Sequence, residues 1–261
     1  MDIKINDNLI KLAKEMDVPL YLVGGYVRDY YLGRVSDDID ICSAMPYEKM
    51  QELCKKLKFK VSIVNKRLGT LLITPEDNIH FEYTPFRVEN YVKGNHSPES
   101  VEFVEDISID AKRRDFTINS IYINVVTREV FDPYNGINDI KKKVVKAIET
   151  PEKVFASDGL RILRLVRFAS SLNFKIDRKT LKIAREMCFQ LRDISPERKK
   201  HELDQIVVAE NKYGVAQNLF VEHFNKLNIY KYLLLLPLNK YNPFTPAKSS
   251  GTLYILAPFD L

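Results

Sequence analysis

The sequence predicts an α+β fold in which a sheet-containing region precedes a helical one. Up to residue 140, short runs of strand formers alternate with turns and short amphipathic helices. Residues 68–74 and 79–86 flank a polar turn, as in a β-hairpin. From residue 141 onward, apolar residues recur at helical spacing. We therefore expect a mixed, mainly antiparallel sheet followed by an all-helical region.

The charge is distributed unevenly along the 261 residues, a length that allows two domains. The net charge is only +5, but residues 141–212 contain 18 basic and 10 acidic residues. This segment therefore carries +8 and the remainder −3. A basic half beside a more acidic half fits a polyanionic partner, although a solvated helical surface explains the charge equally well.

The three cysteines, Cys42, Cys54 and Cys188, are odd in number and widely spaced. This spacing argues against a disulfide framework or a zinc site, so we expect buried, reduced thiols in a cytoplasmic protein. The first residues, MDIKINDN, lack the apolar core of a signal peptide. The apolar run YLLLLPL is too short to span a bilayer, and we expect no membrane association.

The stretch YLVGGYVRDYYLGRVSDDIDI at residues 21–41 suggests a phosphate site. Gly24 and Gly25 permit a sharp turn whose N–H groups, at a helix start, favour phosphate, and Arg28 adds a fork of donors. Asp38 and Asp40 lie two apart on a strand, so they face the same side and can hold Mg²⁺. Each feature alone is commonly a turn or a solvated edge, but together they predict a site for a metal-bound polyphosphate.

The run GGYVRDYYLG followed by DDIDI resembles the signature of the bacterial-type (class II) family of CCA-adding tRNA nucleotidyltransferases and poly(A) polymerases. The segments FEYTPFR, RRDFTINS and DGLRILRLVRFA extend the resemblance over residues 20–210. It implies a nucleotidyltransferase head at 1–140, a helical neck at 141–210 and a shortened helical body at 211–261. Family members usually continue into a longer helical tail that holds tRNA.

The resemblance also implies roles for residues of the head. Glu82 corresponds to a third catalytic carboxylate beside the aspartates of the D-x-D pair. RRDFTINS corresponds to the element that faces the ribose and triphosphate. Arg113 and Arg114 supply charge for phosphates, Asp115 can accept from a ribose hydroxyl, and Asn119 caps or contacts the same site.

Asp158 and Arg161 lie three apart in a helix predicted over residues 157–172. One interpretation is an intrahelical ion pair worth ~0.3–0.5 kcal/mol. The resemblance to the family's D-x-x-R helix implies base selection instead. The carboxylate would accept from the amino group of cytosine or adenine, and the guanidinium would donate to the adjacent ring nitrogen. Ser157 stands where many members have Glu, which weakens the support around Arg161.

The next helix is predicted to begin after Ser195, a good N-cap residue. We expect Arg198 and Glu202 to brace the neck. Lys199 and Lys200 are expected to face tRNA phosphates.

Two further segments follow the family pattern. Residues 87–103 are polar and without periodicity, and they resemble the mobile loop of members that add A as well as C. Residues 131–140, FDPYNGINDI, resemble the joint between head and neck, with Asn135 where a second glycine is common.

The expected reaction is attack of an RNA 3′-hydroxyl on the α-phosphate of CTP or ATP, assisted by two Mg²⁺ ions, with release of pyrophosphate. The expected substrate is the tRNA 3′ end. An A-adding enzyme, a poly(A) polymerase and a catalytically silent RNA-binding paralogue remain alternatives. Nucleotidyl transfer to a small molecule would not need RRDFTINS or DGLR. The sequence does not indicate the oligomeric state.

Overall fold

The computed structural model describes residues 3–36, 38–90, 99–213, 217–229 and 232. It divides into two compact units. The described residues up to Asn90 and from 99 to Lys142 form the first unit, and those from Lys143 onward form the second.

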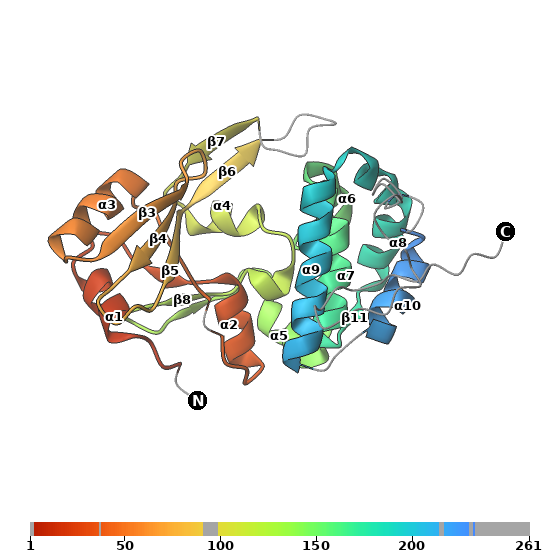
Figure 1. Cartoon of the computed structure of the whole chain (residues 1–261), viewed down its shortest axis with the longest axis horizontal. Helices are drawn as coiled ribbons and strands as arrows, with labels where there is room; N and C mark the ends of the chain where they lie inside the picture. The colour runs from red at the N-terminus through yellow and green to blue at the C-terminus, as the bar shows by residue number, and fades with distance from the viewer. Residues whose placement is uncertain (1–2, 37, 91–98, 214–216, 230–231, 233–261) are drawn as a thin grey trace, which may run out of the picture. The chain divides into compact units, whose positions relative to one another are not determined.

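The first unit is built on a seven-stranded sheet with the order β3-β4-β5-β2-β1-β8-β9. Strands β3, β4, β5 and β8 of this sheet are labelled in Figure 1. Strands β2 and β5 are parallel, and the other neighbours are antiparallel. This confirms the predicted mixed, mainly antiparallel sheet. The strands are β1 (Tyr21–Leu22), β2 (Ile39–Ser43), β3 (Lys60–Asn65), β4 (Thr70–Thr74), β5 (Phe81–Pro85), β8 (Tyr122–Asn124) and β9 (Val130–Phe131).

Short helices accompany this sheet. The side chain of Asn6 caps the first of them by accepting from the N–H groups of Asn8 and Leu9, and Leu9 and Leu12 of this helix enter the core. The helices of the unit are α1 (Asp7–Lys14), α2 (Gly24–Tyr31), α3 (Tyr47–Lys56), α4 (Ile107–Lys112), α5 (Gly136–Lys142) and the 3₁₀ turn η1 (Thr117–Asn119).

The polar segment at 87–103 differs from the expected loop because strands flank its centre. β6 (Arg87–Asn90) and β7 (Ser100–Phe103) pair antiparallel as a ribbon. Residues 91–98, where the mobile loop was expected, lie outside the described residues. The ribbon lacks a continuous buried face, so its sequence does not show the apolar alternation that identifies a half-buried strand.

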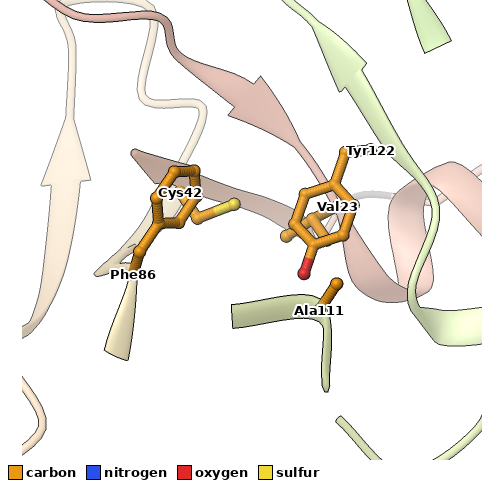
Figure 2. Close-up of a cluster of buried hydrophobic side chains, with 5 residues drawn as sticks. All are labelled: Val23, Cys42, Phe86, Ala111 and Tyr122. Carbon is orange, nitrogen blue, oxygen red and sulfur yellow. The ribbon is translucent and has the colours of Figure 1, made fainter. Parts of the chain in front are cut away.

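A buried cluster joins the segments that contain the predicted motifs. Figure 2 shows its members, Val23, Cys42, Phe86, Ala111 and Tyr122, which are all at most 3% exposed. They come from the glycine turn, β2, the end of β5, α4 and β8. Packing of these apolar groups therefore holds together segments that are far apart in the sequence.

The three thiols are free and buried, as predicted. No helix among the described residues is long and apolar enough to cross a membrane.

The second unit is mainly helical. Helices α7 and α9 run side by side, and α10 also packs against α7 (Figure 1). A short parallel strand pair accompanies the helices. The elements are β10 (Val144–Val145), α6 (Pro151–Ser157), α7 (Leu160–Leu172), β11 (Lys175–Ile176), α8 (Arg178–Met187), the 3₁₀ turn η2 (Cys188–Asp193), α9 (Pro196–Tyr213) and α10 (Gln217–Leu227). Residues 233–261 of the expected body lie outside the described residues.

Candidate active site

The glycine turn connects β1 to α2. Gly24 has a φ of +72°, which is unfavourable for any residue with a side chain, and it begins the helix. Val23, at the N-cap, makes no side-chain capping bond, so the first N–H groups of α2 rely on other acceptors. The N–H of Gly25 opposes the rise in the pKa of the Asp40 carboxylate. The main-chain oxygen of Asp40 accepts from the N–H of Val23 at 3.0 Å. This main-chain bond ties the turn to Asp40.

Three carboxylates gather beside this turn. The parallel register of β2 and β5 places Glu82 directly opposite Asp40. Asp38 precedes β2 by one residue and is exposed. Burial, and secondarily the charge of Glu82, raises the pKa of Asp40 to about 6. Burial and the charge of Asp38 also raise the pKa of Glu82. The arrangement concentrates negative charge that a cation would relieve.

The donor set fits Mg²⁺ rather than a metal that needs a protein cage. Within the described part of the chain, no three His, Cys, Asp or Glu side chains form a ready metal-binding group. Mg²⁺ is commonly held by one or two carboxylates together with substrate phosphates and water. Asp38 and Asp40 offer such a pair of oxygen donors.

A hydrogen-bonded chain links α2 to the segment RRDFTINS. Arg28 Nη1 donates to Asn119 Oδ1 at 2.9 Å, and Arg28 Nε donates to Asp29 at 3.0 Å. Asn119 Nδ2 in turn donates to Asp115 Oδ1 at 3.2 Å, which also accepts the N–H of Phe116. The structure thus brings together three predicted site residues. It also adds Asp29, to which the sequence analysis gave no role.

The two arginines of this segment are anchored by Asp110, which is fully buried. Arg113 lies 2.7 Å and Arg114 3.1 Å from its carboxylate. Tyr122 donates to the same carboxylate at 2.9 Å, and Arg114 Nε lies 2.7 Å from the Tyr122 oxygen. These contacts outweigh the effect of burial and lower the pKa of Asp110 to about 2. The spacings of three and four residues between Asp110 and the arginines were a signal for these ion pairs.

The segment 107–126 does not continue as one helix. Helix α4 ends at Lys112, η1 follows, and the chain then enters β8. The apolar residues Phe116, Ile118, Ile121 and Ile123 recur at a spacing that a helix would also allow, and all are buried. Their burial is achieved by a turn and a strand instead.

The second half of the segment expected as the joint, residues 136–140, lies in the helix α5, which packs on η1. Asp132 accepts the N–H groups of Gly136 and Ile137, and Thr117 donates to Asp139 at 2.7 Å. Asn135 has a φ of +61°, a conformation that Asn tolerates and that glycine would also adopt. The substitution of Asn for the common glycine thus preserves the local backbone.

In the second unit, Asp158 and Arg161 do not share a helix. Asp158 is extended (φ −153°) and ends α6, whereas Arg161 lies in the first turn of α7. Asp158 accepts the N–H of Leu160 and pairs with Arg198 at 2.6 Å. The predicted single helix over 157–172 is therefore wrong, because the chain breaks at Asp158 and Gly159 and α7 starts only at Leu160.

Helix α9 packs against α7, and both Arg198 and Glu202, the residues expected to brace the neck, form ion pairs with residues outside α9. The buried Glu202 accepts from Arg167 at 2.7 Å and from Arg164 at 3.4 Å. Sequence reasoning gave these two arginines no role, although both recur at helical spacing with Arg161. Ser195 accepts from the N–H of Arg198 at 3.4 Å, in agreement with its predicted capping role.

The two lysines of α9 have different environments. Lys199 is 2% exposed and donates to the main-chain oxygen of Tyr232, and burial lowers its pKa. The expectation that Lys199 faces RNA phosphates is therefore wrong, since its side chain is packed inside the unit. Lys200 is exposed and pairs with Asp204 one turn further along the helix.

Comparison with protein families matches two segments of the chain. Residues 20–146 match the poly A polymerase head domain. Residues 173–234 match the probable RNA- and SrmB-binding site of polymerase A. The first match contains the glycine turn, the carboxylates and RRDFTINS.

Curated relatives named CCA-adding enzyme match most of the chain. The one from Streptococcus uberis is 34% identical over 84% of this chain and 53% of its own length. The one from Enterococcus faecalis is 37% identical over 74% of this chain and 46% of its own length. The chain thus spans about half the length of these relatives.

Solved structures share the fold. The Bacillus stearothermophilus CCA-adding enzyme in complex with CTP superposes with a TM-score of 0.73 and 28% identity, covering 88% of this chain and 53% of that chain. A tRNA nucleotidyltransferase complexed with a primer tRNA and an incoming ATP analogue gives 0.66 and 26%, covering 86% and 62%. Together with the head-domain match and the curated relatives, the glycine turn, the carboxylates and the RRDFTINS network show that the chain belongs to the family of CCA-adding tRNA nucleotidyltransferases and poly(A) polymerases.

Proposed function

We propose that the chain adds C and A nucleotides to the 3′ end of tRNA without a nucleic-acid template, using CTP and ATP and releasing pyrophosphate. The observation that carries the proposal is the position of Asp40, which lies beside the glycine turn and directly opposite Glu82 on the neighbouring strand. This arrangement lies in the unit that matches the polymerase head. Because tRNA is the substrate, the proposal implies action in the cytoplasm.

The reaction is attack of the RNA 3′-hydroxyl on the α-phosphate of the nucleotide. Asp38 and Asp40, with Glu82 beside them, would hold Mg²⁺. The ion, when bound, supplies positive charge for the triphosphate and lowers the pKa of the attacking hydroxyl. The N–H groups at Gly24 and Gly25 orient the phosphates.

The segments around the carboxylates position the sugar and the triphosphate. Arg28 and Arg113 offer guanidinium donors to the phosphates, and Arg114 contributes charge from its anchored position. Asp115 accepts from a ribose hydroxyl. Asn119 bonds to both Asp115 and Arg28 and so fixes the positions of these two side chains relative to each other. The bonds from Asn119 to these two side chains support this role.

In the second unit, Asp158 and Arg161 select the base by pairing with the amino group and ring nitrogen that cytosine and adenine share. The ion pair with Arg198 supports a fixed position for Asp158. The exposed Lys200 is the better candidate for an RNA phosphate contact, since its neighbour Lys199 is buried.

A second candidate is an enzyme that adds only A, either once or repeatedly, because the matching head domain is described as that of a poly A polymerase. The test is extension of three tRNA transcripts ending before CCA, after C and after CC. Each is incubated with Mg²⁺ and CTP, ATP or both, at single-nucleotide resolution.

Growth of all three transcripts to CCA, followed by arrest, is the expected result. Addition of a single A to the CC transcript alone would identify an A-adding enzyme, and unlimited A tails a poly(A) polymerase. Absence of extension with intact tRNA binding would indicate a silent paralogue. In every assay, Asp40→Ala is the inactive control, and normal turnover by it would contradict the mechanism.

A further inference from the structure

Five charged side chains form a cluster in the first unit, between the start of the β6–β7 ribbon and the end of α4. Asp110 and Glu89 are its acids, and Arg87, Arg113 and Arg114 are its bases. Every member is mostly buried, since each side chain is at most 16% exposed. The three guanidinium groups thus share two carboxylates within this cluster.

Arg87 is the member whose hydrogen-bonding capacity is incompletely used. Its Nε donates to Glu89 Oε1 at 2.8 Å, and its main-chain N–H donates to Asp110 Oδ1 at 3.3 Å. Its Nη1 is buried and has no hydrogen-bond partner among the residues that the structure describes. Buried polar atoms without partners are uncommon in native proteins. The Nη1 group is therefore a donor that a ligand can satisfy.

Arg87 and Arg113 are held close together by a shared acceptor. Both guanidinium groups contact the same oxygen of Glu89, at 2.8 and 3.4 Å. Burial and the charge of Arg113 lower the pKa of Arg87. Two like charges on one carboxylate oxygen repel each other, and an added anion would reduce that repulsion.

The pair is also within electrostatic range of the carboxylate cluster. The charge of Arg87 opposes the rise in the pKa of Glu82, which lies opposite Asp40 in the sheet. A phosphate between a cation held by carboxylates and a pair of arginines would have favourable charge on both sides.

We propose that Arg87 and Arg113 form a phosphate-binding pair, in which Nη1 of Arg87 donates to a phosphate oxygen of a substrate. Glu89 and Asp110 act as positioning residues that hold the two guanidinium groups. The inference rests on the proposed function, which supplies two sources of phosphate. One is the triphosphate of the incoming nucleotide, and the other is the terminal phosphodiester of the RNA.

The test compares Arg87→Gln and Arg87→Lys with wild type and with a matched control. The control is Arg128→Gln, which removes the same charge from an exposed position of the same unit. Dissociation constants are measured separately for CTP without RNA and for tRNA without nucleotide. Arg87→Gln is expected to weaken one of them by about 10- to 100-fold. Arg87→Lys should recover part of the loss, because it keeps the charge but not the planar fork, and Arg128→Gln should match wild type.

The ligand whose binding weakens identifies the phosphate. Loss of CTP affinity assigns the pair to the triphosphate, and loss of tRNA affinity assigns it to the phosphodiester. Both constants within twofold of wild type in folded Arg87→Gln would overturn the proposal. Circular dichroism establishes whether the variants are folded.

A second measurement tests the phosphate site even if Arg87→Gln fails to fold or the wild-type protein extends no RNA. Inorganic tripolyphosphate should raise the melting temperature of wild type and of Arg128→Gln, but raise that of Arg87→Lys less. Equal shifts in all three proteins would overturn the phosphate site. A smaller melting-temperature shift in Arg87→Lys than in the other two proteins would support the phosphate site. This result would hold even if the wild type extended no RNA and the proposed function were therefore wrong.

Discussion

The Oδ2 atom of Asp40 lies 2.7 Å from the position that a Cβ atom would occupy on Gly24. The turn therefore needs glycine for two reasons, its φ of +72° and the space taken by the carboxylate. Since the N–H of Val23 also donates to the main-chain oxygen of Asp40, the geometry of the turn and the position of the carboxylate depend on each other.

Gly24→Ala is expected to reduce nucleotide addition by about 100-fold or more, because displacing a catalytic group by about 1 Å commonly has an effect of this size. The matched control is Gly33→Ala, which imposes a similar backbone strain at φ +67° but meets no atom within 4 Å. The backbone strain should cost each variant about 1–2 kcal/mol of stability, and Gly24→Ala should lose more because its methyl group also meets Asp40. Rates at saturating tRNA and CTP, with urea unfolding, test the prediction. An equal loss of activity in both variants would contradict it.

Asp40→Asn is expected to stabilise the metal-free protein at pH 8. The pKa of Asp40 is about 6 in the fold but about 3.9 in an unfolded chain. Between these values the folded state binds more protons, so its stability falls as the pH rises to about 6 and stays reduced above it. Asn cannot ionise, so the variant avoids the cost of a buried negative charge. Its free energy of unfolding at pH 8 should exceed that of wild type by on the order of 2 kcal/mol, and this difference should disappear near pH 4.

Urea unfolding in EDTA across this pH range measures the difference. Adding Mg²⁺ should reduce the difference in free energy of unfolding between the variant and wild type at pH 8, because the ion stabilises the ionised wild type more than the variant. A variant that is less stable than wild type at pH 8 without metal would refute the assignment of the raised pKa.

Gly136→Ala is expected to destabilise the first unit by more than about 3 kcal/mol, since overpacking against rigid backbone cannot relax easily. A Cβ atom at this position would lie 2.2 Å from the main-chain oxygen of Thr117. The neighbouring Asn135→Gly change should be nearly neutral, because glycine readily adopts the φ of +61° found there. Thermal unfolding of the two variants gives the comparison, and similar melting temperatures would count against the packing described here.

Glu202→Gln is expected to destabilise the second unit by about 2 kcal/mol or more, because the buried carboxylate pairs with Arg164 and Arg167. Asp204→Asn removes an equal charge from the same helix, but from an exposed pair with Lys200. That change should cost less than about 0.5–1 kcal/mol. Amide hydrogen exchange in α7 and α9 measures both, and equal effects would show that burial of Glu202 contributes nothing.

Much of the sheet could be predicted from sequence because its strands carry local signals. The alternation of buried Phe81 and Tyr83 with Glu82 marks β5, and the glycine pair marks the turn. The β6–β7 ribbon could not be predicted in this way, since its residues do not alternate between a core and solvent. The end of α4 is also not marked in the sequence, because the apolar spacing after it satisfies both a helix and a turn followed by a strand.

The members of the candidate site were easier to predict than their partners. Family motifs pointed to Arg28, Asn119 and Asp115, but only the fold shows that they bond to one another. The burial of Lys199 was missed because its position in the chain resembles that of the exposed Lys200. Which face of a helix is covered depends on packing with distant segments, which local periodicity does not specify for a polar helix.

The parallel pairing of β2 and β5 places Asp40 opposite Glu82, so the proposed catalysis depends on the register of these two strands. A slip of β5 by one residue would move Glu82 to the opposite face and expose Phe81 and Tyr83 to water. The energetic cost of exposing those rings therefore protects the alignment of two carboxylates that lie 42 positions apart in the chain. An insertion or deletion within β5 would therefore destabilise the folded state as well as misalign the carboxylates, so a chain with this change would fail to fold stably.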